Sequence, residues 1–110
     1  RTSKRYPEAL TAYQKGLQID PTHADAWANQ SVVLWHLQRY KASLEAASKA
    51  IQLNPKSLAG WYNQGVALME LGRYTDALMA FERVLILNPS SAEALTGRGL
   101  ALSQLKKYPE

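Results

Sequence analysis

Apolar positions between residues 58 and 91 recur at the spacing of one face of an α-helix, in two separate stretches. The first stretch has Trp61, Leu68 and Leu71 at such positions. The second has Ala77, Leu78, Phe81, Val84, Leu85 and Leu87. Gly72-Arg73-Tyr74 separates the stretches, and Pro89 ends the second because the residue before a proline is pushed out of helical geometry. The segment is therefore predicted to be a helical hairpin.

The same pattern returns along the chain every 34 residues. Prolines occupy positions 21, 55 and 89, and tyrosines occupy positions 6, 40, 74 and 108. Leucines keep this step in three registers, at 10, 44 and 78, at 34, 68 and 102, and at 37, 71 and 105. Trp27 and Trp61 are followed at the same step by Leu95. So many coincident registers indicate an internal repeat of one hairpin.

The repeat resembles that of the tetratricopeptide repeat family. The shared features are an aromatic residue early in the first helix, a small residue inside it, a tyrosine before the second helix, small residues within that helix and a closing proline. The resemblance covers essentially all 110 residues. It implies an all-α fold, an α-solenoid of antiparallel helix pairs in a right-handed superhelix, with the first helices lining the concave surface. It also implies a non-catalytic protein–protein interaction scaffold.

The register divides the chain into a single array. We predict that residues 1–23 end one repeat and hold mainly its second helix, that 24–57 and 58–91 are full repeats, and that 92–110 hold the first helix of a further, truncated repeat. Arg1-Thr2-Ser3 is expected to end a first helix. The next helix, from Pro7 to about Ile19, is predicted to use Tyr13, Leu17 and Ile19 as its apolar face and Ala9 and Gly16 as close-approach points. The last helix is predicted over residues 92–106, with Leu95, Gly99, Leu102 and Leu105 on its packed face.

Thr22, Ser57 and Thr75 are predicted to cap the N-termini of three helices, because their hydroxyl groups can accept from free backbone N–H groups. The 24–57 repeat departs from the family pattern at Ser31, where the later repeats have glycine, at Ser43, and at Ala47, which replaces a large aromatic residue. The last change predicts either a void or a closer approach of the two helices. We expect this hairpin to be the loosest.

Hydrophobic residues make up 46% of the chain, but no apolar run approaches the roughly 18 residues of a membrane span. No cysteine is present, which excludes disulfides and thiolate chemistry and is compatible with any compartment. We expect a soluble, cytoplasmic protein with no membrane partner. The net charge of +4 is predicted to lie in the turns after first helices, either as a solvated ridge or as a site for an acidic partner, at Lys4, Arg5, Arg39, Arg73, Lys106 and Lys107.

No constellation for catalysis is present in the sequence. His23 is expected in a turn and His36 near the end of a helix, and a lone imidazole makes neither a metal site nor a triad. Gly97-Arg98-Gly99 lies inside a helical pattern with no strand before it, so it is not a phosphate loop, and Gly99 is predicted to mark a helix–helix contact. We therefore predict no enzyme activity, cofactor or metal.

The exposed face of each first helix is predicted to line the concave groove. Asn29 and Asn63 either grip a peptide backbone or are simply solvated. Trp35, Tyr62 and Met69 are predicted anchors for an apolar side chain, although Trp35 could instead fill the space left by Ala47. The predicted peptide-binding residues are Asp25, Asn29, Val32, Trp35, His36, Tyr62, Asn63, Val66, Met69, Glu70 and Leu100.

Two kinds of groove partner are not expected. Family members that recognise a C-terminal carboxylate use Lys and Arg on the inner helices, but the matching positions here are Ala28, Val32, Ala59, Asn63 and Gly97, and only the amide at Asn29 is matched. Nucleic acid is not expected either, because the predicted groove carries Asp25, Glu70 and Glu93 against His36 alone.

Two functional classes follow from the sequence. The first is a non-catalytic scaffold that binds a peptide or a helix of a partner protein in the groove. The alternative is a structural spacer or self-assembly segment of a larger protein that stacks head to tail. In that alternative, the helix near Leu95 to Leu105 of one molecule would meet the helix from Pro7 to Ile19 of another, because array ends leave apolar surface uncovered.

Overall fold

The computed structural model describes residues 5–110, and this part of the chain contains six α-helices and no strand. The helices are α1 (Tyr6–Ile19), α2 (Ala24–His36), α3 (Tyr40–Leu53), α4 (Leu58–Glu70), α5 (Tyr74–Leu87) and α6 (Ala92–Lys107). The all-α prediction is confirmed. The predictions for Arg1-Thr2-Ser3 and Lys4 lie outside the described residues.

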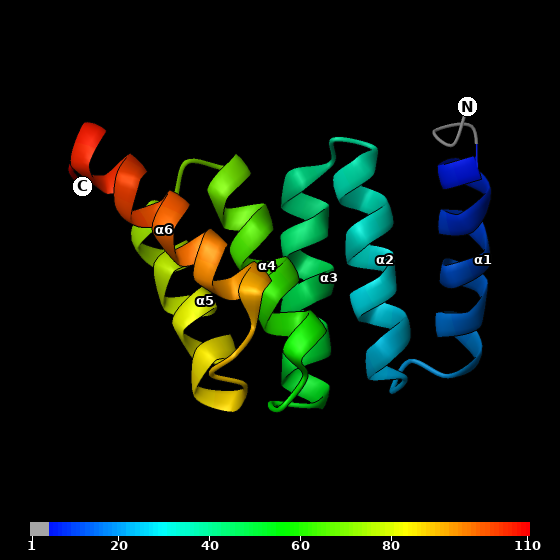
Figure 1. Ribbon diagram of the computed structural model, residues 1–110. Helices are drawn as coiled ribbons and strands as arrows, with labels where there is room; N and C mark the ends of the chain where they lie inside the picture. The colour runs from blue at the N-terminus through cyan, green and yellow to red at the C-terminus, as the bar shows by residue number, and fades with distance from the viewer. Residues whose placement is uncertain (1–4) are drawn as a thin grey trace.

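The helices stand side by side in an elongated stack measuring 42 × 29 × 23 Å, with the two chain ends at opposite ends of the row (Figure 1). Each helix packs against the next one in the chain. The first helices of successive hairpins also pack against each other, α2 on α4 and α4 on α6, whereas α3 and α5 do not pack together in this way. The stack therefore curves with α2, α4 and α6 on its inner side.

The loops that lead into first helices share one local structure. The side chains of Asp20, Asn54 and Asn88 each accept a hydrogen bond from the backbone N–H two residues later, which forms a turn before the proline-containing loop continues. The indole N–H of Trp27 donates to the Pro21 carbonyl at 2.8 Å, and that of Trp61 donates to the Pro55 carbonyl at 2.7 Å. The repeated Trp and Pro are therefore a structural pair that ties each loop to the helix after it.

The helix caps agree only in part with the sequence predictions. Ser57 accepts from the Gly60 N–H at 2.9 Å, which confirms it as an N-cap. The Thr22 prediction is wrong, because its hydroxyl donates to Asp20 and α2 begins one residue further on. The Thr75 prediction is also wrong, because α5 already begins at Tyr74.

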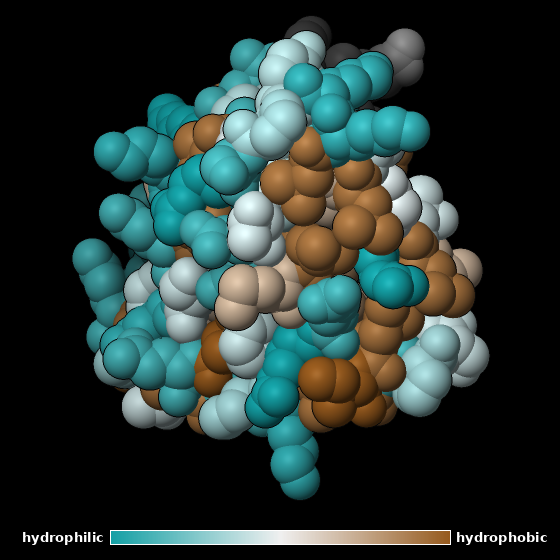
Figure 2. Space-filling view, turned by 90° about the vertical axis from the view of Figure 1, so that its left-hand side faces the viewer, coloured by the Kyte–Doolittle hydropathy of each residue, from teal (hydrophilic) through white to brown (hydrophobic). Residues whose placement is uncertain are grey.

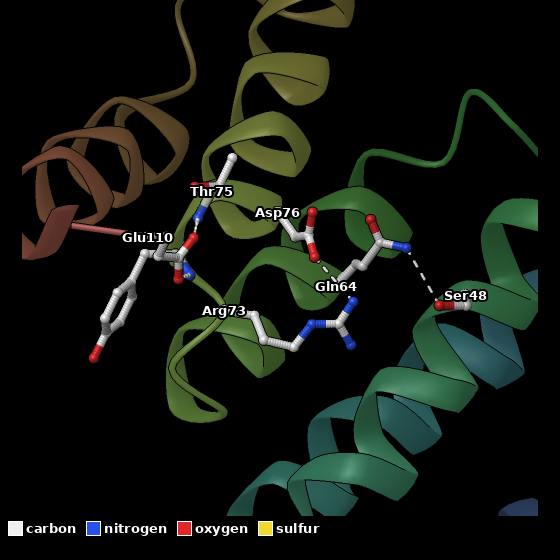
Figure 3. Close-up of polar contacts among 7 residues, drawn as sticks. Ser48, Gln64, Arg73, Thr75, Asp76 and Glu110 are labelled. Atoms are coloured by element: carbon white, nitrogen blue, oxygen red, sulfur yellow. Dashed lines mark hydrogen bonds and ion pairs between the residues drawn. The ribbon is translucent and has the colours of Figure 1, made fainter. Parts of the chain in front are cut away.

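The N-terminus of α5 is bound by a side chain from the far end of the chain. The Glu110 carboxylate accepts from the backbone N–H groups of Tyr74 and Thr75, each at 3.0 Å (Figure 3). The Tyr108 ring also stacks on the Tyr74 ring with 6.3 Å between centroids. These hydrogen bonds lower the pKa of Glu110, the largest contribution coming from Thr75. Glu110 thus accepts from backbone N–H groups at the start of α5, where no neighbouring side chain forms an N-cap hydrogen bond.

The two full hairpins fill the space between their helices differently. In α4–α5, the fully buried Phe81 ring lies against Gly65, where an added Cβ would be 2.7 Å from a ring carbon. In α2–α3, Ser31 and Ser43 are buried and each hydroxyl donates to the other's backbone carbonyl at 2.8 Å. Because serine side chains are short, these bonds require close helix backbones beside Ala47, as the closer-approach alternative predicted.

The packed faces predicted for the first and last helices are partly wrong. Ile19 is 87% exposed, and an added Cβ at Gly16 or at Gly99 would meet nothing within 4 Å. Leu95 and Leu102 are 48% and 46% exposed, although Leu68, at the position equivalent to Leu102, is buried. The physical reason is that these side chains face the sides of α1 and α6 against which no further described helix packs.

Candidate functional site

Two cavities lie along the inner side of the stack. The larger, about 620 Å³, is formed mainly by α4 and α6, and its lining residues are Tyr62, Val66, Met69, Glu70, Tyr74, Phe81, Ala92, Glu93, Thr96, Gly97, Leu100 and Gln104. The smaller, about 270 Å³, is formed mainly by α2 and α4, and its lining residues are Ser31, Val32, Trp35, His36, Ser43, Tyr62, Asn63 and Val66. Tyr62 and Val66 line both cavities, so the two form one groove across the three first helices.

At the base of the larger cavity, the Phe81 ring packs against Gly65 and Gly97, which have no side chain. An added Cβ would be 2.7 Å from the Phe81 ring at Gly65 and 2.6 Å from it at Gly97. The ring is therefore held between α4 and α6, and the Tyr62 ring lies over it at a centroid distance of 5.8 Å. Phe81 was not predicted as a groove residue, because its position in the repeat indicates only a core residue.

Aromatic residues also form the wall of the smaller cavity. The Trp35 ring meets the His36 ring edge to face at 5.0 Å, and His36 stacks on Tyr6 at 4.4 Å. The Trp35 indole N–H is buried and has no hydrogen-bond partner among the described residues. It differs in this respect from Trp27 and Trp61, whose N–H groups bind loop carbonyls. Trp35 is thus the tryptophan that faces the groove.

The two asparagines have different environments. Asn63 is half-buried and donates from Nδ2 to the Ala28 carbonyl at 3.1 Å, so its amide joins α4 to α2 and is not simply solvated. Asn29 is exposed and lines neither cavity, and the same holds for Asp25. The other nine predicted groove residues each line one or both cavities.

The charge of the groove is opposite to that of the whole chain. The chain has 13 Lys and Arg residues against 9 Asp and Glu residues, yet among residues 5–110 only Glu70 and Glu93 line the cavities with a full charge. Neither carboxylate has an ion-pair partner within residues 5–110. Burial, and then the nearby negative charge of Glu93, raise the pKa of the Tyr62 hydroxyl. The larger cavity is therefore an acidic and aromatic surface.

The lysines and arginines among residues 5–110 lie outside the groove. Arg5, Arg39 and Arg73 are exposed and occupy the positions just before α1, α3 and α5. Arg73 forms an ion pair with Asp76 at 2.9 Å, and the Gln64 side chain donates to the Ser48 hydroxyl at 3.2 Å (Figure 3). Polar side chains outside the groove therefore bind one another.

Neither a metal site nor a membrane span is found in the described part of the chain. His23 is exposed at the start of α2, and no group of three or more His, Cys, Asp or Glu residues within 5–110 could hold a metal ion. None of the helices there is both long enough and apolar enough to cross a membrane.

Stacked antiparallel helix pairs with a groove along the first helices define a helical repeat protein. The family model described as tetratricopeptide repeat matches residues 2–57 and 62–110. The chain therefore belongs to the tetratricopeptide repeat family. A comparison with curated proteins gave no match.

Solved structures with the same fold include two domains with bound peptides. The first tetratricopeptide repeat domain of Spaghetti (RPAP3), bound to the HSP90 peptide SRMEEVD, is 25% identical with a TM-score of 0.92, covering 96% of this chain and 83% of that chain. The second such domain of human RPAP3, in complex with the HSP70 peptide SGPTIEEVD, is 26% identical with a TM-score of 0.87, covering 92% and 84%. The Sgt2 domain from Aspergillus fumigatus is 21% identical with a TM-score of 0.90, covering 94% and 70%, and shows the fold alone.

Proposed function

We propose that this chain is a non-catalytic protein-interaction scaffold whose concave groove binds a peptide or a helix of a partner protein. The observation that carries the proposal is the continuous groove formed where the two cavities share Tyr62 and Val66. Two related domains hold peptides of partner proteins, which supports the same use of the fold here.

The groove has the features of an interaction surface. Val32 is 40% exposed and Leu100 is 55% exposed, and both line the cavities beside aromatic rings. Concave sites with apolar walls and a few polar groups are typical of binding pockets, which enclose about 300–1,000 Å³. The Trp35 side chain adds aromatic surface to the smaller cavity. Asn63 lines the same cavity, and its hydrogen bond to the Ala28 carbonyl uses only one N–H of its amide.

The test is selection of peptides from a random displayed library, followed by measurement of their affinities by fluorescence polarisation. We expect the substitutions Val32→Asn and Leu100→Asn together to lower affinity by about tenfold or more, because apolar contact with the peptide is lost. Met79→Asn and Ile86→Asn are the matched controls, since these side chains are 62% and 68% exposed and line neither cavity of the groove. Equal losses in both pairs, or no selected peptide, would contradict the proposal.

A second candidate function is self-assembly through the open faces of α1 and α6. Figure 2, seen from the α6 end of the stack, shows apolar side chains gathered on this face, where Leu95 and Leu102 are exposed. In α4–α5 the ring of Phe81 covers Gly65, and the equivalent pair is Tyr13 in α1 and Gly99 in α6. The α1 of a second molecule could therefore complete a hairpin with α6, with Tyr13 over Gly99.

Light scattering at rising concentration tests this assembly. We expect the average mass to increase with concentration, and the increase to disappear in a Leu95→Gln and Leu102→Gln variant, because the apolar contact area is removed. Ile86→Gln on α5 is the control and should leave the association unchanged. A monomer mass that stays constant over the whole range would rule out stacking.

A further inference from the structure

We propose that the groove selects a basic partner segment, in which an arginine or lysine side chain lies next to a large apolar one. The proposal rests on the proposed peptide-binding function and names the chemistry of the partner. The occupant differs from the acidic peptides that the two related domains hold, whose sequences end in EEVD.

Charge complementarity is the first argument. Glu70 and Glu93 both line the larger cavity, and each is exposed and free of an ion pair within the described residues. In the described part of the chain no lysine or arginine lines either cavity, although the whole sequence carries a net charge of +4. A cationic side chain would pair with these carboxylates, whereas an acidic peptide would meet like charge and no compensating base.

The aromatic rings of the same cavity give the second argument. Tyr62 and Tyr74 line it together with the two carboxylates, and both rings are partly exposed. The faces of aromatic rings attract cations, and guanidinium groups bind both to rings and to carboxylates. The cavity thus combines the two groups that bind an arginine side chain.

Apolar surface beside the acidic residues is the reason to expect a large apolar side chain next to the basic one in the partner segment. Leu100 and Val66 line the same cavity, and Val66 also lines the smaller one together with Trp35. A large apolar side chain placed there would cover surface that is otherwise in contact with water. A cationic side chain one or two residues away along an extended segment then reaches the carboxylates, since each residue spans about 3.3 Å.

The test uses three labelled peptides that share a central Phe and differ only in their flanking residues, which are all Arg, all Ser or all Glu. We expect the Arg peptide to bind about tenfold more tightly than the Ser peptide, and the Glu peptide to bind most weakly. The Arg advantage should shrink as salt is added, because ions screen exposed charge pairs. The acidic peptide SRMEEVD is a further probe and should bind no better than the Glu peptide.

A charge-neutral double variant shows whether the two carboxylates are responsible. Glu70→Gln with Glu93→Gln should abolish the Arg advantage, so that the Arg and Ser peptides bind this variant with equal affinity. Glu45→Gln is the matched control, because Glu45 is exposed on α3, lies outside the groove and has no ion pair among the described residues. Circular dichroism checks that all variants keep their helix content.

The outcomes separate this inference from the proposed function. Equal binding of the Arg and Ser peptides, a preference for the Glu peptide, or an Arg advantage that survives the double variant would overturn the basic-partner inference and leave peptide binding intact. Failure of all the peptides to bind, together with an empty library selection, would overturn both.

Discussion

The α2–α3 and α4–α5 hairpins occupy equivalent places in the repeat, but they fill the space between their helices by different physical means. In α4–α5, a large ring at Phe81 is accommodated by the absence of a side chain at Gly65. In α2–α3, the ring is replaced by Ala47, and the equivalent contact is made by hydrogen bonds of a buried serine pair. The same backbone arrangement can therefore be stabilised by apolar volume or by polar groups that satisfy each other.

The difference also extends to the groove. Phe81 lines the larger cavity, although its ring is almost fully buried against Gly65 and Gly97. In α2–α3, Ser31 and Ser43 line the smaller cavity together with Trp35. The two adjacent cavities therefore differ in the side chains at their base, an aromatic ring in one and a serine pair in the other.

The largest expected effect comes from removing the ring. Phe81→Ala should lower the free energy of unfolding by about 3–5 kcal/mol, because a fully buried aromatic side chain leaves a cavity. Adding Gly65→Ser and Ala77→Ser, which copy the serine pair of α2–α3, should restore about 1 kcal/mol of this loss. Urea denaturation measures both changes. A triple variant no more stable than Phe81→Ala would show that the polar arrangement cannot be transferred.

Breaking the serine pair should have the next largest effect. Ser31→Ala or Ser43→Ala alone should destabilise by about 1–3 kcal/mol, because each leaves buried groups of the pair without a partner. The double variant should cost less than the sum of the two, because the two hydroxyl groups also lie 3.0 Å apart and each single change removes this shared contact. The double-mutant cycle measures this coupling. Strictly additive losses would show that each hydroxyl contributes only through its own bond to a backbone carbonyl.

A methyl group added at equivalent glycines should have opposite effects. Gly65→Ala should destabilise by about 1–3 kcal/mol, because the new Cβ would overlap the Phe81 ring. Gly99→Ala in α6 should instead stabilise by up to about 1 kcal/mol, since alanine favours a helix and the site is open. Thermal unfolding compares the two variants. In a Phe81→Ala background the penalty at Gly65 should vanish, and a penalty that persisted there would point to a different obstacle.

The smallest effect concerns the loops that begin the two hairpins. Hydrogen bonds from the Thr22 side chain, and then from its backbone N–H, lower the pKa of Asp20 in the folded chain. A lowered folded pKa gives stability that is present above the unfolded pKa and is lost as the pH falls through the folded one. Asp20→Asn, which matches Asn54 at the start of α4, should leave stability at neutral pH nearly unchanged and weaken its dependence on acid pH. Unfolding curves between neutral and acidic pH test this.

The amino-acid sequence alone determined the repeat and its helices. Tyrosines, prolines and leucines at a constant step predicted helical hairpins, because hairpin periodicity is a local property of the chain. The two helices for which bounds were predicted, Pro7 to about Ile19 and 92–106, agree with α1 and α6 to within one residue. The sequence also placed most groove residues on the inner helices, since residues at equivalent repeat positions share a face.

Only the tertiary structure decided which side chains meet between hairpins. Asn63 binds the carbonyl of Ala28, and Gly97 rather than Gly99 packs against Phe81, because these contacts join helices of different repeats. A position defined by the 34-residue step does not specify whether its side chain faces its own hairpin or the preceding one. The hairpin that a side chain faces depends on how the helices of neighbouring hairpins pack. This packing also determines which acidic and aromatic side chains line the groove.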